Sequence, residues 1–267
     1  MSDVVPEIGL GTSRNDDPEQ CAESVRTALE AGYRHVDTAQ GYGNEAAVGD
    51  GVARADVPRE EVFLATKVGS DNLAYEDVLA STEASLDRLG VDYVDLLYVH
   101  WPIGTYDPEE TLRAFDELYD DGTIEHVGVS NFTPDLLAEA ADLLDAPIVA
   151  NQVEMHPMLP PRAELTEYCR SRGIELVAYS PLCRGEALDL PEVRTVAENH
   201  GVSPARAILA WLLSRDLRVV SKAVGEAHIR DNLAALDLEL DADDVELIDS
   251  VDRRKRKFDR EDAPWNR

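Results

Sequence analysis

The feature that most constrains the fold is a regular alternation of two kinds of segment along almost the whole chain. Short apolar runs of strand type are separated by longer amphipathic segments of helical period. The runs span residues 34–39, 62–68, 94–100, 124–130, 147–153, 174–180, 217–224 and 236–240. Strands and helices that alternate eight times over about 250 residues are typical of a (β/α)8 TIM barrel, an α/β fold.

Several amphipathic segments begin with recognisable helix start signals. Thr133-Pro134 and Ser203-Pro204 place a polar residue before a proline, and Pro160-Pro161 also puts proline near a first turn. Asp107-Pro108 is followed by two acids, which suit the positive end of a helix dipole. The first helix is expected over about residues 18–31.

The chain shows no sign of a domain boundary. No Pro/Gly/Ser-rich linker or change of composition divides it, so we expect a single domain over residues 1–267. The alternative fold is a doubly wound sheet, which requires a Gly-rich phosphate loop after an early strand. No G-x-G-x-x-G sequence occurs, so the barrel is favoured.

The charge balance is extreme, with 54 acidic residues against 25 basic ones and a formal net charge of -29. Hydrophobic residues make up 44%, which is typical of a folded protein with an acidic surface. Such a surface repels nucleic acid and anionic lipid, and its self-repulsion is relieved by high salt. No signal peptide or membrane-spanning run is visible. We therefore expect a cytoplasmic, monomeric protein of halophilic type that binds neither nucleic acid nor membrane.

Lysine and cysteine are both scarce. The lysines are Lys67, Lys222, Lys255 and Lys257, and the cysteines are Cys21, Cys169 and Cys183. A lysine inside an apolar run is costly to bury, so Lys67 and Lys222 are candidates for function. The cysteines lack the spacing of metal ligands, and we expect neither a disulfide framework nor a metal site.

Polar side chains stand at the ends of seven consecutive strand-type runs. In chain order they are Asp37, Lys67, His100, Ser130 with Asn131, Gln152, Tyr179 with Ser180, and Lys222. The catalytic groups of a TIM barrel lie at the carboxyl ends of its strands. One such residue is usually satisfied by loop backbone, whereas seven in succession indicate an active site. Tyr42, in the Gly-rich loop QGYGNE, is expected to lie over the same opening.

Four of these residues suggest a specific chemistry. Buried Lys67 requires a partner, and Asp37 is the candidate. A lysine ammonium beside the phenol of Tyr42 is expected to lower the tyrosine pKa, which makes Tyr42 a proton donor. His100 is placed to orient a substrate oxygen. Because no Ser or Cys nucleophile accompanies them, the set predicts protonation of a carbonyl oxygen while another group attacks the carbon.

Six segments resemble, in order, the motifs of the aldo-keto reductases. They read VDTAQGYGNE, TKV, VHWP, GVSNF, NQVEMHP and AYSPL. The similarity is strongest to short prokaryotic members that reduce diketo-sugar acids and related carbonyls, and it extends over residues 6–266. It implies a TIM barrel that binds NADP(H) across its opening and transfers hydride to an aldehyde or ketone. NAD(H) is a second candidate cofactor.

The resemblance also implies roles for individual residues. Asp37, Tyr42, Lys67 and His100 match the family's catalytic tetrad, with Tyr42 as the acid. The positions that match cofactor contacts are Thr12, Ser130, Asn131, Gln152, Tyr179, Ser180, Leu182, Lys222 and Asn232. Among them, Ser130, Asn131 and Gln152 match the carboxamide contacts, Tyr179 the ring that stacks on nicotinamide, and Ser180 and Leu182 the pyrophosphate contacts.

Some positions depart from the family pattern. The hairpin that usually precedes GLGT is reduced to a stub, and Ser13 and Gly69 stand where large aromatic residues are common. Trp101 remains to line the substrate pocket, and Trp265 in the C-terminal tail over the barrel opening either borders that pocket or anchors the terminus. Near the adenosine, His228 replaces an arginine. We therefore expect a modest preference for NADPH with appreciable use of NADH.

Three features of the sequence favour other functions less strongly. A nicotinamide-binding regulatory subunit of the same fold is the main alternative, and the intact tetrad argues against it. A metal-dependent hydrolase is disfavoured because no spaced His/Asp ligand set is present. His156, Glu154 and His100 are candidates for a metal site, but the family match makes His156 a structural residue. The basic run RRKRK, residues 253–257, resembles a nucleic-acid patch, but in so acidic a chain it is expected to pair with surface acids.

Overall fold

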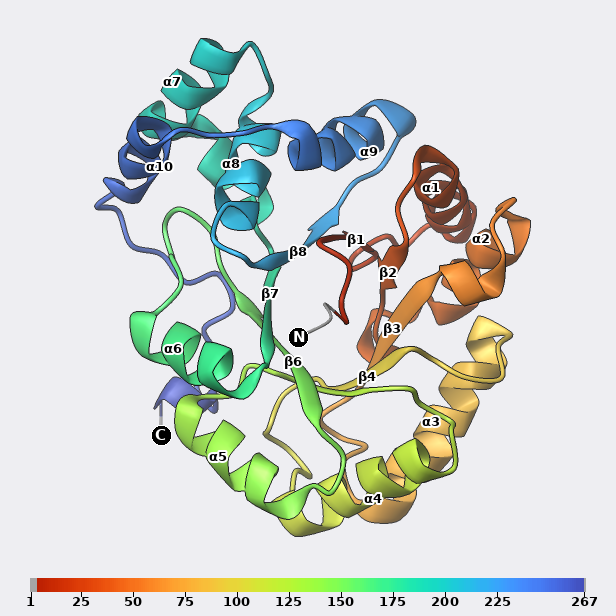
Figure 1. Cartoon of the computed structure of the whole chain (residues 1–267). Coiled ribbons are helices and arrows are strands. Elements are labelled where there is room, and N and C mark those ends of the chain that lie inside the picture. The colour runs from red at the N-terminus through yellow and green to blue at the C-terminus, as the bar shows by residue number, and fades with distance from the viewer. Residues whose placement is uncertain (1–3, 267) are drawn as a thin grey trace.

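The computed structural model describes residues 4–266, which form a closed barrel of eight parallel strands surrounded by helices (Figure 1). The strands are β1 Ile8–Gly11, β2 His35–Asp37, β3 Phe63–Val68, β4 Leu96–Val99, β5 Val127–Ser130, β6 Ile148–Glu154, β7 Glu175–Tyr179 and β8 Arg218–Lys222. Their order around the barrel is the order along the chain, so the fold is the predicted (β/α)8 TIM barrel.

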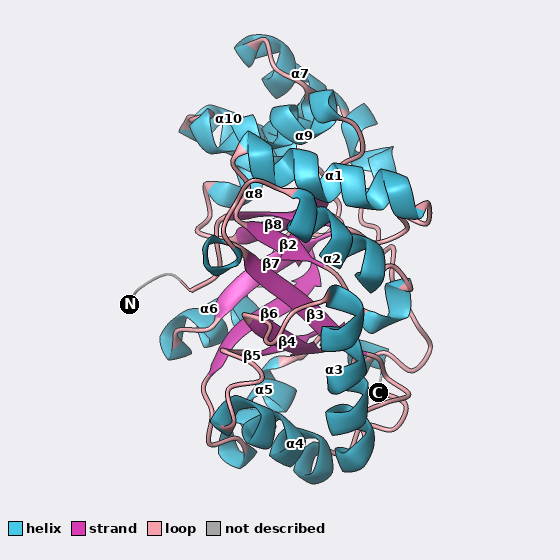
Figure 2. Cartoon of the chain, turned by 90° about the vertical axis from the view of Figure 1, so that its right-hand side faces the viewer, coloured by secondary structure: helices cyan, strands magenta, loops and turns pink. Residues whose placement is uncertain are grey.

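The helices form the outer layer that covers the strands (Figure 2). They are α1 Pro18–Ala31, α2 Glu45–Arg54, α3 Tyr75–Leu89, α4 Pro108–Asp120, α5 Pro134–Leu143, α6 Ala163–Arg172, α7 Pro191–His200, α8 Pro204–Leu213, α9 Glu226–Leu233 and α10 Ala242–Asp249. Within residues 4–266, no helix is long and apolar enough to cross a lipid bilayer.

Most of the predicted helix starts are confirmed by side-chain caps, whereas α6, which follows Pro160-Pro161, begins at Ala163 with no side-chain cap. Asp17, Asp107, Thr133 and Ser203 each accept a hydrogen bond from a backbone N–H of the first turn, and proline follows each of them. The first helix spans the predicted residues 18–31. Side-chain caps of this kind contribute about 1 kcal/mol each, and they fix the point at which each loop at the barrel opening ends.

One predicted strand is wrong. Residues 236–240 form no strand, because a 3-10 helix, Ala234–Asp237, ends inside them and Leu236 is 44% exposed. The barrel is closed instead by β1, which pairs with β2 and β8. The remaining seven predicted runs each overlap one strand of the barrel, and β6 extends one residue beyond its predicted run.

The sequence of β1, IGLG, does not indicate a strand because glycine has low strand propensity. Both glycines are required by close packing inside the barrel. A Cβ atom at Gly9 would lie 2.5 Å from Nδ1 of His35, and one at Gly11 would lie 2.9 Å from Cγ1 of Val220. Residues 236–240, LDLEL, show the alternating pattern of a half-buried strand but have no place in the closed sheet.

The N-terminal segment closes one end of the barrel without a hairpin. Between residue 4 and β1 the structure has no strand, in keeping with the predicted stub. Val5 is buried in the barrel interior against Leu96, Tyr98 and Val220, among others. The backbone N–H groups of Val4 and Val5 donate to the carboxylate of Glu175, at 3.2 and 2.7 Å.

The C-terminal tail crosses the opposite end of the barrel, where the strands have their carboxyl ends. Glu154, at the end of β6, accepts hydrogen bonds from the backbone N–H of Lys257 at 2.7 Å and of Phe258 at 3.0 Å. Nε2 of His156 lies 2.9 Å from Oε1 of Glu154, and both side chains are fully buried. The predicted structural role of His156 is thus to hold the carboxylate that anchors the tail.

Candidate active site

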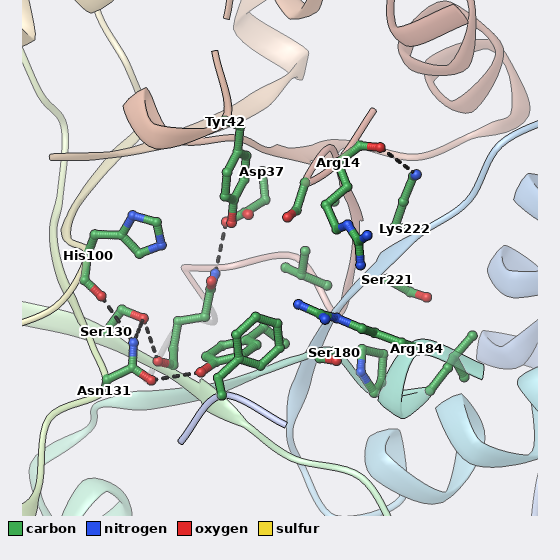
Figure 3. Close-up of a pocket in the computed structure, with 18 of the residues that line it drawn as sticks. Arg14, Asp37, Tyr42, His100, Ser130, Asn131, Ser180, Arg184, Ser221 and Lys222 are labelled. Atoms are coloured by element: carbon green, nitrogen blue, oxygen red, sulfur yellow. Dashed lines mark hydrogen bonds between the residues drawn. The ribbon is translucent and has the colours of Figure 1, made fainter. Parts of the chain in front are cut away.

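A cavity of about 680 Å³ lies at the carboxyl ends of the strands (Figure 3). Predicted site residues that line it are Asp37, Tyr42, His100, Trp101, Ser130, Asn131, Gln152, Tyr179, Ser180, Leu182 and Lys222. The other predicted residues, which do not line it, are Thr12, Lys67, His228, Asn232 and Trp265.

A buried ion pair lies beneath the cavity. Nζ of Lys67 is 2.5 Å from Oδ1 of Asp37, and the two side chains are 1% and 3% exposed. Nζ also donates to the carbonyl oxygen of Thr38 at 2.7 Å, while Nε2 of Gln152 donates to the other carboxylate oxygen at 2.8 Å. Burial alone would lower the pKa of Lys67, but the neighbouring Asp37 and Tyr42 raise it above its usual value. The ammonium is therefore charged at neutral pH.

Tyr42 lies above this pair, with its ring centroid 5.3 Å from Nζ of Lys67. Burial raises the pKa of Tyr42 above its usual value, although Lys67 acts in the opposite direction. The expected lowering of this pKa is therefore wrong, because the sequence does not show how strongly burial acts on the phenol. At neutral pH Tyr42 carries its proton, and Lys67 is placed to stabilise the phenolate that remains once the proton is transferred.

His100 faces Tyr42 across the cavity. The ring centroids are 5.9 Å apart and the rings are nearly perpendicular, with an interplanar angle of 83° (Figure 3). Burial lowers the pKa of His100 to about 3, with further contributions from the positive charges of Lys67 and Arg260. The imidazole is therefore neutral at physiological pH, and it offers one N–H donor to an oxygen atom in the cavity.

The polar residues that end β5, β6 and β7 form one hydrogen-bonded network. Oγ of Ser130 donates to the backbone carbonyl of Gln152 at 2.8 Å. Nδ2 of Asn131 donates to Oγ of Ser130 at 3.0 Å and to the carbonyl of His100 at 3.1 Å. The hydroxyl of Tyr179 donates to Oδ1 of Asn131 at 2.9 Å. Because these groups hold one another, the ring of Tyr179 has a fixed position on one wall of the cavity.

Three predicted residues lie just behind the wall instead. The hydroxyl of Thr12 donates to the carbonyl of Asp37 at 3.0 Å. Asn232 is buried, and its Nδ2 donates to Oγ of Ser221 at 3.4 Å. The ring of Trp265 lies 5.6 Å from that of Trp101, and its Nε1 donates to Asp259 at 3.1 Å. Trp265 thus both anchors the tail and packs behind a lining residue. His228 is exposed on α9.

The sequence analysis missed the cationic end of the cavity. Arg14 and Arg184 both line it, and Figure 3 shows their guanidinium groups turned into the same end, near Ser180 and Lys222. Nζ of Lys222 donates to the carbonyl oxygen of Arg14 at 2.9 Å. Arg14 lies in the loop after β1, next to Thr12 and Ser13, but it belongs to none of the motifs that identified the other site residues. Recognition of β1 would have identified it.

Comparison with known proteins places the chain in a family. The pattern that defines the aldo/keto reductase family matches residues 7–253. The chain belongs to this family. The enzyme is 40% identical over 252 residues to the glyoxal reductase of Bacillus subtilis (strain 168), with 94% of this chain and 91% of the relative covered. It is 41% identical over 257 residues to an aldo-keto reductase of Mycobacterium sp. (strain JLS), with the same coverage.

Solved structures agree with this assignment. The enzyme superposes on a putative 2,5-diketo-D-gluconic acid reductase B with a TM-score of 0.89 and 36% identity, covering 92% of this chain and 88% of the other. An aldo-keto reductase of Bombyx mori in complex with NADP gives a TM-score of 0.89 at 31% identity, covering 97% and 92%. The protein is thus an NAD(P)H-dependent reductase of carbonyl groups.

The residues of the cavity fit this cofactor. Arg14, Arg184 and Lys222 supply the positive charge that phosphate groups require. The ring of Tyr179 supplies a flat, fixed surface for an aromatic ring. The volume of about 680 Å³ lies within the usual range for cofactor sites. One continuous cavity therefore has a cationic end, formed by these three residues, and a second end lined by Asp37, Tyr42 and His100.

Proposed function

We propose that the enzyme reduces an aldehyde or ketone by proton donation from Tyr42 to the carbonyl oxygen. The observation that carries this proposal is the buried Lys67–Asp37 pair beneath a protonated Tyr42, with neutral His100 opposite. His100 orients the carbonyl oxygen through its N–H, so that the oxygen faces the phenol. Lys67 stabilises the phenolate as the proton leaves. NADPH, when bound, supplies the hydride that the carbonyl carbon accepts, and the product is an alcohol.

The cofactor would extend between the two ends of the cavity. Ser130, Asn131 and Gln152 would hold the carboxamide, and the ring of Tyr179 would stack on the nicotinamide. Thr12 would contact the cofactor through its backbone, and Ser180 and Leu182 would contact the diphosphate. Lys222, Asn232 and His228 would lie toward the adenosine. The lining of the cavity by most of these residues supports this placement.

The pKa shifts predict a flat pH profile for carbonyl reduction. Tyr42, with a raised pKa, remains protonated through neutral pH, and His100, with a pKa of about 3, remains neutral. We expect kcat at saturating substrate and NADPH to change less than about twofold between about pH 5 and pH 8, since neither group titrates there. A steep change centred near pH 6.5 would mean that His100 titrates during turnover, contrary to its burial.

The substrate is proposed to be a small dicarbonyl compound. Two similar proteins are named for dicarbonyl substrates, a glyoxal reductase and a putative 2,5-diketo-D-gluconic acid reductase. In this chain the pocket wall consists of Trp101 and Phe258, with Trp265 behind it, and Ser13 also lines the cavity. The test is a panel of monocarbonyl and dicarbonyl compounds in high salt, with oxidation of NADPH and NADH followed separately. Cofactor binding without turnover on any compound would favour the regulatory alternative.

We expect a modest preference for NADPH, with appreciable NADH activity. Lys222 lines the cavity, whereas His228 is exposed on α9 outside the lining, so the arrangement favours Lys222 as the contact to the 2′-phosphate. The kcat/KM ratio of NADPH to NADH is expected to be about 2 to 5, the effect of an exposed ion pair. Lys222→Ala should abolish the preference. If His228→Ala also changes the ratio, and does so more strongly near pH 6, then His228 reaches the phosphate.

The acidic surface is proposed to be an adaptation of a monomeric cytoplasmic enzyme to high salt. With a net charge of -29, screening should relieve repulsion among the surplus carboxylates. We expect Tm and kcat to rise together between dilute buffer and about 1 M KCl, where the screening length falls to about 3 Å. A Tm that stays constant over this range would contradict the halophilic interpretation and leave the enzymatic activity unaffected.

A further inference from the structure

The loop after β7 is held in an unusual conformation beside the cavity. The φ angles of Ser180, Cys183 and Arg184 are 53°, 48° and 55°, and that of Gly185 is 91°. Non-glycine residues rarely adopt positive φ, and such conformations persist only where surrounding contacts impose them. The consequence in this loop is that the side chain of Arg184 points into the cationic end of the cavity (Figure 3).

The contacts that hold this loop come from the C-terminal tail. The carboxylate of Glu186 pairs with Nζ of both Lys255 and Lys257, which lower the pKa of Glu186 to about 2. Arg253 adds a third positive charge at 3.8 Å from the same carboxylate. Two residues earlier in the loop, the guanidinium of Arg184 lies 4.8 Å from the ring centroid of Phe258, also in the tail. The loop is therefore fixed to the tail on both sides of Gly185.

The tail cations are themselves held in place by backbone contacts. The N–H of Lys255 donates to the carbonyl of Met158 at 3.0 Å, and that of Lys257 donates to Glu154 at 2.7 Å. Half of the four lysines in the chain thus contact one carboxylate. Because the backbone that carries them is anchored on the loop after β6, they give Glu186 a defined position rather than a mobile surface contact.

Arg14 and Arg184 both reach the cationic end of the cavity. Arg14 approaches from the loop after β1 and Arg184 from the loop after β7, so their guanidinium groups reach the cavity from two sides (Figure 3). Among residues 4–266, neither guanidinium has a carboxylate partner. Guanidinium groups bind phosphate oxygens in pairs of parallel hydrogen bonds. Two such groups that face one another suit a ligand with two adjacent phosphates.

We propose that Arg14 and Arg184 bind the diphosphate of NADP(H) from two sides, and that Glu186 positions Arg184 for this contact through Lys255 and Lys257. The inference rests on the proposed placement of the diphosphate beside Ser180. It gives the tail a second role, because the segment that borders the substrate pocket also determines how firmly the cofactor is held.

The first test compares the Kd of NADPH and NADH, measured by isothermal titration calorimetry, in wild type and Arg184→Gln. Loss of a charged hydrogen-bond donor should weaken both cofactors by the same factor, roughly 10- to 100-fold, because both contain the diphosphate. Arg172→Gln, which removes an arginine that stacks on Tyr168 outside the cavity, is the matched control and should change neither Kd. Weakening of NADPH alone would assign Arg184 to the 2′-phosphate and overturn the proposal, as would unchanged affinity for both.

The second test addresses the positioning role of Glu186. Glu186→Gln and Lys257→Gln should each raise the Kd of both cofactors by about 3- to 10-fold and speed their dissociation, and the double variant should be no worse than either single one. Asp189→Asn is the control, because Asp189 lies in the same loop but pairs with Arg194 rather than the tail. An equal effect of Asp189→Asn, or strictly additive effects in the double variant, would refute the positioning role. Both tests measure cofactor binding only. A negative result would therefore not affect the proposal that Tyr42 donates the proton, which is tested by the turnover of Tyr42→Phe.

Discussion

Replacement of Tyr42 by phenylalanine is expected to lower kcat by roughly 10²- to 10⁴-fold, the usual contribution of a general acid. The variant keeps the ring that packs against His100 and lies above Lys67, and it loses only the hydroxyl that donates the proton. The Kd of NADPH should therefore stay nearly constant. Single-turnover measurements with saturating NADPH separate the chemical step from cofactor binding and product release.

Tyr98→Phe is the matched control for this prediction. The ring centroid of Tyr98 lies 5.7 Å from Nζ of Lys67, close to the distance for Tyr42, but Tyr98 is buried in the barrel interior and does not line the cavity. The same loss of a hydroxyl there should leave kcat within about threefold of the wild type. Near-normal turnover by Tyr42→Phe would exclude Tyr42 as the proton donor.

The candidate catalytic residues could be predicted to lie together because of their positions in the sequence. Asp37, Lys67 and His100 each end an apolar run, and in a parallel barrel the carboxyl ends of all strands meet at one opening. A pattern of strands and helices together with that topological rule places these residues around one cavity without any coordinates. In the structure, Asp37 and His100 line the cavity, and Lys67 lies directly beneath it and pairs with Asp37.

What the sequence failed to predict depends on close packing and backbone conformation. The strand IGLG has little strand propensity, and its glycines are explained only by the neighbours His35 and Val220. Arg14, in the loop after β1, was missed although Thr12 and Ser13 beside it were identified, because none of the matched motifs includes it. Arg184 was missed because its direction depends on a run of positive φ angles that no motif encodes.

The pKa of Tyr42 is another property that the sequence did not predict. The sequence identified the charge beside the phenol but not the degree of burial, and burial proved to be the larger influence. The proposed role of Tyr42 does not depend on a low pKa in the resting enzyme. An acid that stays protonated over the whole physiological range is always ready to donate, provided that Lys67 stabilises the anion it leaves behind.

Lys67→Met is expected to impair both catalysis and stability. Loss of the ammonium removes the charge that stabilises the phenolate of Tyr42, so kcat should fall by about as much as in Tyr42→Phe. It also leaves Asp37 buried without its cation, and removal of one partner of a buried ion pair typically costs about 3–5 kcal/mol of unfolding free energy. Urea titrations of wild type and variant in the same KCl concentration measure this loss.

The direction of the pKa shift of Lys67 determines the pH at which the two stabilities should be compared. The pKa of Lys67 is raised in the folded state, so its stabilising contribution is complete below the unfolded value of about 10.4 and is lost only as pH rises through the higher folded value. At pH 7 the full difference between wild type and Lys67→Met should therefore be seen. The part of the difference that comes from the Lys67 charge should shrink in strongly alkaline solution.

A second substitution separates the two effects of Lys67→Met. In the double variant Asp37→Asn with Lys67→Met, no buried charge is left unpaired, and the side-chain oxygen of Asn can still accept the hydrogen bond from Nε2 of Gln152. Most of the lost stability should return, while kcat should remain as low as in the single variant. Recovery of turnover along with stability would mean that Lys67 serves only to neutralise Asp37. If neither returns, the destabilisation arises from packing around the methionine, and the unpaired carboxylate is not its cause.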